Sequence, residues 1–169
     1  MKFSTERLIL RTVTEYDAHD ILNIRSNIEI NEFLHRDPPK DSFEALYFIL
    51  NIKRKAENKE IVFLGIALQN DPKLIGTICL WNFSKNKSTA ELGYELLPKY
   101  QGKGIMSEAV NCILDYGFNH LNLKKIEAFT NKNNLDSIKL LEKTKFVLNK
   151  KRKDEKYPEN IIFELSAFK

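Results

Sequence analysis

Three strand-like segments follow one another in the middle of the chain. Residues 61–68 form a continuous apolar run, which predicts a buried strand. Residues 74–83 and 89–97 are the next two strand-like segments, and the polar residues 84–88 form the loop between them. Consecutive strands joined by short turns predict an antiparallel meander.

Helical periodicity occurs on both sides of this meander. Residues 105–121 carry apolar pairs that recur every four residues, which predicts an amphipathic helix with a wide buried stripe. Asp41 and Ser42 are suited to capping another helix. The residues that we expect to face inward along that helix are Phe43, Leu46, Tyr47, Leu50 and Ile52.

The two ends of the chain add further elements. In chain order these are a strand at 7–12, a helix starting at Thr14, a short helix at 28–34, a strand at 126–130, a helix at 134–143 with Leu135, Ile138 and Leu141 inward, and closing strands at 146–150 and 161–168. The sequence therefore predicts one α+β domain over residues 1–169, a single mixed, mostly antiparallel sheet with helices on both faces.

The charge balance excludes some function classes. Lys and Arg number 27 against 23 Asp and Glu, and a net charge of +4 is too small by itself to indicate nucleic-acid binding. No apolar run approaches the roughly 20 residues of a membrane span. The charged Lys2, Glu6 and Arg7 lie where a signal peptide would need an apolar stretch. We therefore expect a cytoplasmic protein without a membrane partner.

Cysteines and histidines show no pattern of metal or redox chemistry. Cys79 and Cys112 lie in apolar segments without the spacing of a metal or redox motif, so we expect small buried side chains. The histidines form no cluster with carboxylates at ligand spacing, so we expect no metal.

Glycines mark the junction between the third strand and the long helix, at Gln101-Gly102-Lys103-Gly104. A Walker loop needs Ser or Thr after its lysine, and a dinucleotide fingerprint needs a third glycine; the junction has neither. The first N–H groups of a helix lack internal partners and lie at the positive end of its dipole, where phosphates bind. The junction predicts an anion site, although a glycine turn that only starts a helix has the same pattern.

The same junction resembles the Q/R-x-x-G-x-G/A loop with which the GNAT acyltransferase superfamily binds the pyrophosphate of acetyl-CoA. Gln101 and Gly104 match this loop, whereas Met106 replaces the usual Gly or Ala. We expect the larger side chain to keep the helix from approaching the ligand as closely. Contacts through backbone N–H groups do not depend on that side chain, so we expect binding to persist.

Other segments resemble the ribosomal-protein N-terminal acetyltransferase-like branch of that superfamily, in the same order along the chain. They are residues 5–11 (TERLILR), 92–96 (LGYEL), 107–109 (SEA) and 134–137 (NLDS). Lys145 departs from the branch, which usually has Gly before Phe146 to end the helix in a left-handed turn.

The resemblance implies an acetyl-CoA site around the junction. The residues expected to bind the cofactor are Leu96, Leu97, Gln101, Gly102, Lys103, Gly104, Ile105, Met106, Ser107, Asn134, Ser137 and Lys143. In the family the preceding strand splays from its neighbour, so Leu97 is expected to offer a backbone N–H to the thioester oxygen. An ordinary strand end before Pro98 is the alternative.

Two side chains are candidates for the chemistry. Ser137 is expected to donate a hydrogen bond to the leaving thiolate, with Asn134 bonding the pantetheine amides; helix capping alone explains the same two residues. Glu95 is expected to take the amine proton, and Glu91 lies on the same face of the strand. The alternative is an ion-paired or solvent-facing Glu95, with another carboxylate such as Glu159 or Glu164, or solvent, as the base.

The acceptor side is less defined by the sequence. By family analogy His35, Trp81 and Phe83 line it, and the acceptor is a primary amine of a small molecule or a protein N-terminus. We expect direct attack in a ternary complex, in a monomer or homodimer. The alternatives are a non-catalytic acyl-CoA-binding module on the same fold and an RNA-binding protein that uses the basic residues 150–153.

Overall fold

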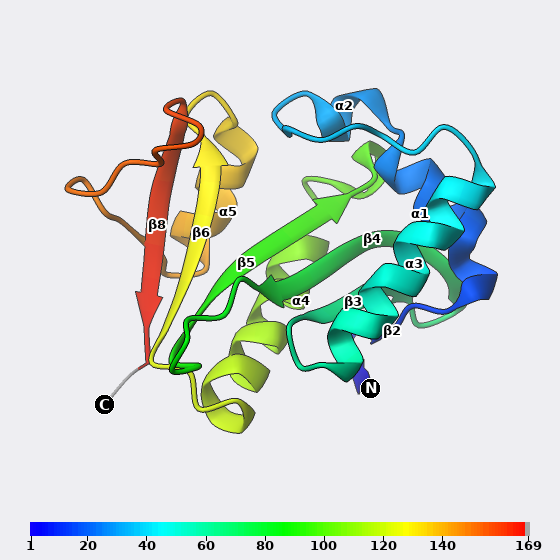
Figure 1. Ribbon diagram of the computed structural model, residues 1–169, viewed down its shortest axis with the longest axis horizontal. Helices are drawn as coiled ribbons and strands as arrows, with labels where there is room; N and C mark the ends of the chain where they lie inside the picture. Colours follow the sequence, from blue (N-terminus) through cyan, green and yellow to red (C-terminus); the bar gives the residue numbers. More distant parts are fainter. Residues whose placement is uncertain (168–169) are drawn as a thin grey trace.

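The computed structural model describes residues 1–167, which form an eight-stranded sheet in the order β1-β2-β3-β4-β5-β6-β8-β7 (Figure 1). The strands are β1 (Lys2–Ser4), β2 (Leu8–Thr12), β3 (Val62–Leu68), β4 (Asp71–Trp81), β5 (Thr89–Leu96), β6 (Lys125–Asn131), β7 (Val147–Leu148) and β8 (Asn160–Ser166). Within these residues β5 and β6 pair in parallel and the other neighbours pair antiparallel. The predicted mixed, mostly antiparallel sheet is confirmed.

The predicted meander is β3, β4 and β5, and its residues alternate between the two faces of the sheet. Leu64 and Ile66 of β3 pack into the larger hydrophobic core on one face. Phe63 and Ala67 of the same strand pack into a second core on the other face. This period of two explains why the strand reads as a continuous apolar run, because both faces are covered.

Helices cover both faces, as predicted (Figure 1). The elements are η1 (Glu15–Asp17), α1 (Ala18–Arg25), α2 (Ile28–Asn31), α3 (Ser42–Glu57), η2 (Pro98–Tyr100), α4 (Ile105–Asp115), the π-helix η3 (Tyr116–His120) and α5 (Leu135–Lys143). In Figure 1, α3 lies in front of the sheet and α4 lies behind it. Residues of α1 and α3 form the second core, and residues of α4 and α5 contribute to the larger one.

The inward face of α3 differs from the prediction. Phe43 and Tyr47 are 83% and 69% exposed, whereas Ala45 and Ile49 are buried. Ala45 and Ile49 lie one turn apart, and the small alanine lets α3 pack closely on its neighbours. Leu135 of α5 was also expected inward and is 63% exposed. In both helices the first aromatic or aliphatic residue after the cap points to solvent.

The ends of several elements also differ from the prediction. β1 was not predicted, and β7 is shorter than expected. The helix that begins at Ile105 changes to π-helical turns at Tyr116. The predicted end of the last strand, Phe168, lies outside the described residues.

The parallel pair β5 and β6 opens the sheet. Their pairing runs from Thr89 with Lys125 to Glu91 with Glu127 and stops there, although both strands continue. Figure 1 shows the two strands diverging like the arms of a V. The expected splay is therefore present, and it leaves the β6-facing edge of β5 unpaired beyond Glu91.

Candidate active site

A cleft of about 490 Å³ lies where β5 diverges from β6 and α4 begins. Its lining combines residues of α2, the end of β5, the glycine junction and α5. The predicted cofactor residues that line it are Leu96, Gln101, Gly102, Gly104, Ile105, Met106, Ser107, Asn134, Ser137 and Lys143. Segments far apart in the sequence therefore meet at one cavity.

The glycine junction forms an open cradle at the start of α4. Gly102 and Gly104 have φ of 70° and 74°, a left-handed conformation that other residues adopt at a cost. Gly104 is the N-cap, and the first helical bond is donated by Glu108 to its carbonyl at 3.1 Å. The N–H groups of Ile105, Met106 and Ser107 therefore have no partner within the helix and lie at its positive end, as an anion requires.

The two polar side chains of the junction donate to nearby backbone carbonyls. The Gln101 Nε2 group donates to the Leu96 carbonyl at 2.8 Å and ties the junction to β5. The Lys103 Nζ group donates to the Lys99 carbonyl at 2.7 Å, and Lys103 is not part of the cleft lining. The Lys103 side chain is therefore bonded within its own segment, and the junction offers backbone N–H groups to the cleft.

Met106 does not obstruct the start of α4. Its side chain is 8% exposed and packs into the larger hydrophobic core. A side chain that points into the core leaves the N–H end of the helix accessible, so the departure from the family pattern is compatible with a bound diphosphate.

The expectation of an unpaired N–H at Leu97 is wrong. The Leu97 N–H donates to the Ile75 carbonyl at 2.9 Å, toward β4, and Leu97 does not line the cleft. Successive N–H groups of a strand point to opposite neighbours. The Leu96 N–H is therefore directed toward β6, where pairing has already ended at Glu91.

Ser137 belongs to a chain of three hydroxyl groups. Thr130 Oγ1 donates to Ser137 Oγ at 2.8 Å, and Ser137 Oγ lies 2.7 Å from the Tyr94 hydroxyl, where either group can donate. Tyr94 and Ser137 line the cleft, whereas Thr130 lies behind them. Asn134 caps α5 by accepting from the Ser137 N–H at 3.1 Å, so the capping role of Asn134 is also present.

Tyr94 was not singled out from the sequence as a functional residue. Burial raises the pKa of Tyr94 to about 12, so the phenol keeps its proton at neutral pH. Because Ser137 already accepts from Thr130, the Tyr94–Ser137 pair retains one proton beyond the bond that the two share. That proton is available to a group in the cleft.

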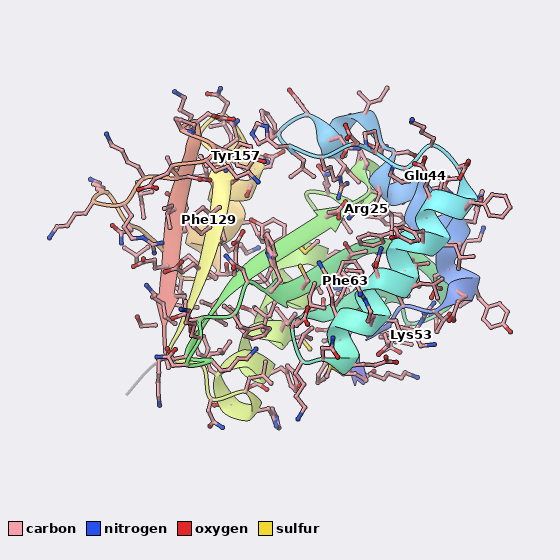
Figure 2. All side chains as sticks on the ribbon, viewed as in Figure 1. Arg25, Glu44, Lys53, Phe63, Phe129 and Tyr157 are labelled. Atoms are coloured by element: carbon pink, nitrogen blue, oxygen red, sulfur yellow. The ribbon has the colours of Figure 1, made fainter. Side chains whose placement is uncertain are left out.

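Glu95 is held by two arginines. Its Oε1 lies 3.1 Å from Arg25 Nη1 and its Oε2 lies 2.5 Å from Arg36 Nη2. Arg25, labelled in Figure 2, comes from the end of α1 and also lies over the Phe48 ring at 3.9 Å. Arg36 is fixed further by Asn31, which accepts from its Nε at 2.8 Å. Glu95 therefore lies at the cleft as an ion-paired carboxylate.

Glu91 has a different environment from Glu95. In the described part of the chain it forms no ion pair, and its hydrogen bond comes from Asn82 Nδ2 at 3.3 Å. Burial raises the pKa of Glu91 to about 7, and the nearby carboxylates of Asp154 and Glu127 act in the same direction.

The residues expected at the acceptor side are separated by the structure. The His35 ring stacks on Tyr157 at 3.9 Å with an interplanar angle of 4°, and its Nε2 lies 2.6 Å from Glu159 Oε1. This clasp, formed by His35, Tyr157 and Glu159, joins the segment before α3 to the segment before β8. Trp81 is 44% exposed beside Gly93 on β5.

Phe83, also expected at the acceptor side, does not line the cleft. Its side chain packs against the larger hydrophobic core, on the face of the sheet that α4 covers. Asn82, with φ of 49°, bends the backbone between Trp81 and Phe83, and Lys87 covers the Phe83 ring at 5.0 Å.

Residues 1–167 contain neither a cluster of metal ligands nor a helix suited to span a membrane. None of these residues group into three or more His, Cys, Asp or Glu side chains placed to hold a metal ion. Over the same residues, no helix has the length and apolar character needed to cross a membrane.

The sequence and the fold match known proteins. Residues 7–147 match the family model of the acetyltransferase (GNAT) domain. The chain is 32% identical over 142 residues to the uncharacterized N-acetyltransferase YoaA of Bacillus subtilis, covering 84% of this chain and 80% of that protein. It is 31% identical over 141 residues to the spermidine N(1)-acetyltransferase of Vibrio cholerae, covering 83% and 79%.

Solved structures share the fold at lower identity. The ribosomal-protein-S5-alanine acetyltransferase of Vibrio fischeri superposes with a TM-score of 0.84 at 24% identity, over 98% of this chain and 96% of that one. The microcin C7 self-immunity acetyltransferase MccE, solved with acetyl-CoA and AMP, superposes with a TM-score of 0.81 at 20% identity, over 96% and 94%.

Proposed function

The chain belongs to the GNAT acetyltransferase family, and on this premise we propose that it transfers the acetyl group of acetyl-CoA to a small primary amine by direct attack in a ternary complex. Membership makes the chain an acetyltransferase with acetyl-CoA as donor. The observation that carries the proposal is the convergence of an open helix start, the Leu96 N–H and a hydroxyl pair on one cleft.

The cleft fits the donor by the chemistry of its walls. The N–H groups at the start of α4, beside glycines that leave the approach open, suit the diphosphate of CoA. Asn134 and Lys143 line the α5 side of the cleft. The Asn134 amide suits the amides of pantetheine, and the Lys143 ammonium suits a phosphate of CoA. When bound, acetyl-CoA supplies an activated acetyl group.

Two groups of the chain assist transfer in this proposal. The Leu96 N–H points into the gap between β5 and β6, where it polarises the thioester carbonyl and stabilises the negative charge that forms on the oxygen. The Tyr94–Ser137 pair donates a hydrogen bond to the sulfur as negative charge forms there, and it keeps its proton. Together they supply hydrogen bonds that strengthen in the transition state.

Glu95 has a positioning role in this proposal. Taking a proton from the amine would cost it one of two ion pairs, so it is poorly suited to act as a free base. By holding Arg25 and Arg36, it fixes the wall between α1, α2 and the cleft. The amine then attacks as its neutral form, with its proton leaving to solvent on the acceptor side.

The acceptor that we propose is a small, flexible aliphatic amine. The clasp joins the segment that follows Phe33 and Leu34 of the cleft lining to the segment before β8, which restricts the approach of a folded protein more than that of a narrow chain. Glu29 and Glu32 line the cleft from the α2 side and suit a cationic acceptor. The relative from Vibrio cholerae that is named for spermidine supports this acceptor class.

A thiol-release assay with acetyl-CoA tests the proposal. The panel contains linear diamines and polyamines, free amino acids, and short peptides that begin with serine or alanine. We expect turnover with at least one linear amine and a lower kcat/KM for every peptide. Turnover confined to peptides would contradict the proposed acceptor, and CoA binding without turnover on any amine would contradict the proposed reaction.

A further inference from the structure

Arg7 connects the N-terminal segment of the chain to the glycine junction. It lies just before β2, and its Nη1 donates to the Lys103 carbonyl at 2.9 Å. Its Nε donates to Glu108 Oε2 at 2.7 Å, in the first turn of α4. One guanidinium therefore bonds to both the junction and the helix that follows it.

The Glu108 carboxylate completes a brace that consists of Thr5, Arg7 and Glu108. Its Oε1 accepts from Thr5 Oγ1 at 2.5 Å and from the Arg7 backbone N–H at 2.9 Å. Although burial opposes ionisation, the hydrogen bonds from Thr5 and Arg7 lower the pKa of Glu108, so the carboxylate stays charged at neutral pH. Gln69 in turn holds Thr5, because its Nε2 donates to the Thr5 carbonyl at 2.8 Å.

Peptide geometry links this brace to the ligand side of the junction. The Lys103 carbonyl and the Gly104 N–H belong to one planar trans peptide and point in opposite directions. A carbonyl held toward Arg7 therefore directs the Gly104 N–H away from Arg7. Glycine residues on both sides of Lys103 leave this peptide few steric constraints of its own, so an external bond decides its orientation.

The guanidinium also lies close to Gly104 itself. A Cβ added at Gly104 would lie 3.4 Å from Arg7 Nη2. Arg7 therefore brings a positive charge to the junction, whereas the Lys103 ammonium is bonded to the Lys99 carbonyl. This charge comes from the opening segment of the chain, outside the glycine motif.

We propose that Arg7 is a positioning residue for the diphosphate of CoA, which holds the Lys103–Gly104 peptide in the orientation that turns the Gly104 N–H toward the ligand. The proposal rests on acetyl-CoA as the donor and does not depend on which amine is acetylated.

The test compares a donor that has the diphosphate with one that lacks it. Acetyl-pantetheine carries the same thioester as acetyl-CoA without the diphosphate and nucleotide. For Arg7→Ala we expect the Kd of CoA, measured by calorimetry without amine, to rise about tenfold, and kcat/KM with acetyl-CoA to fall by a similar factor. With acetyl-pantetheine as donor we expect kcat/KM to stay within about twofold of the unsubstituted protein.

Two further variants make the result specific. Arg7→Lys retains the charge and one donor, so it should recover part of the CoA affinity. Arg11→Ala removes an arginine of β2 whose ion pair, with Asp17 at 2.7 Å, is away from the junction, and it should leave CoA binding unchanged. If Arg7→Ala does not fold, Glu108→Gln with the same two donors replaces it. Equal losses with both donors, or no loss with acetyl-CoA, would overturn the proposal.

Discussion

Removing the hydroxyl groups of Tyr94 and Ser137 tests the chemistry most directly. The two oxygens lie 2.7 Å apart, and the pair keeps one proton that is not used between them or by Thr130. The double variant Tyr94→Phe/Ser137→Ala removes that proton whichever oxygen carries it. The two single variants show which oxygen faces the sulfur, because only the donor's removal should cause most of the loss.

The pKa of Tyr94 sets the size of the effect. Burial raises this pKa to about 12, whereas an alkyl thiol such as cysteine has a pKa of about 8.5. Full proton transfer from the phenol to a thiolate is therefore uphill by about 3.5 units, or roughly 5 kcal/mol. The pair acts by hydrogen bonding to forming charge, which contributes about 1.5–3 kcal/mol and corresponds to a factor of about 10–150 in kcat.

Steady-state kinetics with thiol detection measures this factor. Thr130→Val is the matched control, because Thr130 lies outside the cleft lining and bonds to the same serine. Thr130→Val should lower the free energy of unfolding by about 1 kcal/mol and leave kcat nearly unchanged. A double variant with kcat within about threefold of the unsubstituted protein would refute the proposed donation, since the loss would lie below that of one charged hydrogen bond.

Four further predictions follow from other contacts. Glu95→Gln should raise KM for the amine more than it lowers kcat; a loss of about 10²–10⁴ in kcat would instead identify Glu95 as the base. His35→Ala should open the clasp with Tyr157, raise turnover of short peptides relative to linear amines, and leave KM for acetyl-CoA unchanged; an unaltered acceptor profile would contradict the role of the clasp. Because burial raises the pKa of Glu91 from 4.5 to about 7, the folded chain keeps a proton between these pH values that the unfolded chain has lost, so stability falls as pH rises through this window. Glu91→Gln should remove that pH dependence and raise the free energy of unfolding at pH 8 by about 1–2 kcal/mol, as thermal melts across pH would show. Lys145, with φ of 72°, occupies a left-handed turn, so Lys145→Gly should stabilise the fold by about 0.5–1 kcal/mol in denaturant unfolding, and a loss of stability would show that the lysine side chain contributes there.

Local sequence patterns were sufficient to predict the strands, the helix and the glycine junction that surround the cleft. The meander and the long helix follow from periods of two and of about four residues, and both are present. Gly102 and Gly104 were predicted to open the helix start, and both adopt positive φ there. These features depend on neighbours in the sequence, so a sequence carries enough information to place them.

Features that depend on long-range register were not predictable. Whether the Leu96 or the Leu97 N–H is bonded to β4 depends on the register between β5 and β4. The residues next to Leu96 and Leu97 in the sequence do not determine this register. Arg25 and Arg36 reach Glu95 from separate parts of the N-terminal half of the chain. The hydroxyl partner of Ser137 likewise comes from a different element, so Tyr94 was overlooked.

Strand β5 explains why the functional groups are arranged as they are. Its side chains alternate between faces, so Tyr94 points toward the α4 and α5 side and Glu95 points toward α1 and α2. The Leu96 N–H lies in the plane of the sheet, in the gap left by β6. In the proposed mechanism, the hydrogen bond to the sulfur, the wall on the acceptor side and the hydrogen bond to the carbonyl oxygen therefore come from three consecutive residues, Tyr94, Glu95 and Leu96, which point in three directions. A shift of one residue in the pairing of β5 with β4 would change all three, because the Leu96 N–H would then bond to β4 and Tyr94 would face α1. The Gly76–Leu96 pairing resists such a shift, since a Cβ at Gly76 would lie 2.3 Å from the Glu95 carbonyl oxygen. The fit of a glycine against β5 thus fixes the register on which the proposed chemistry depends.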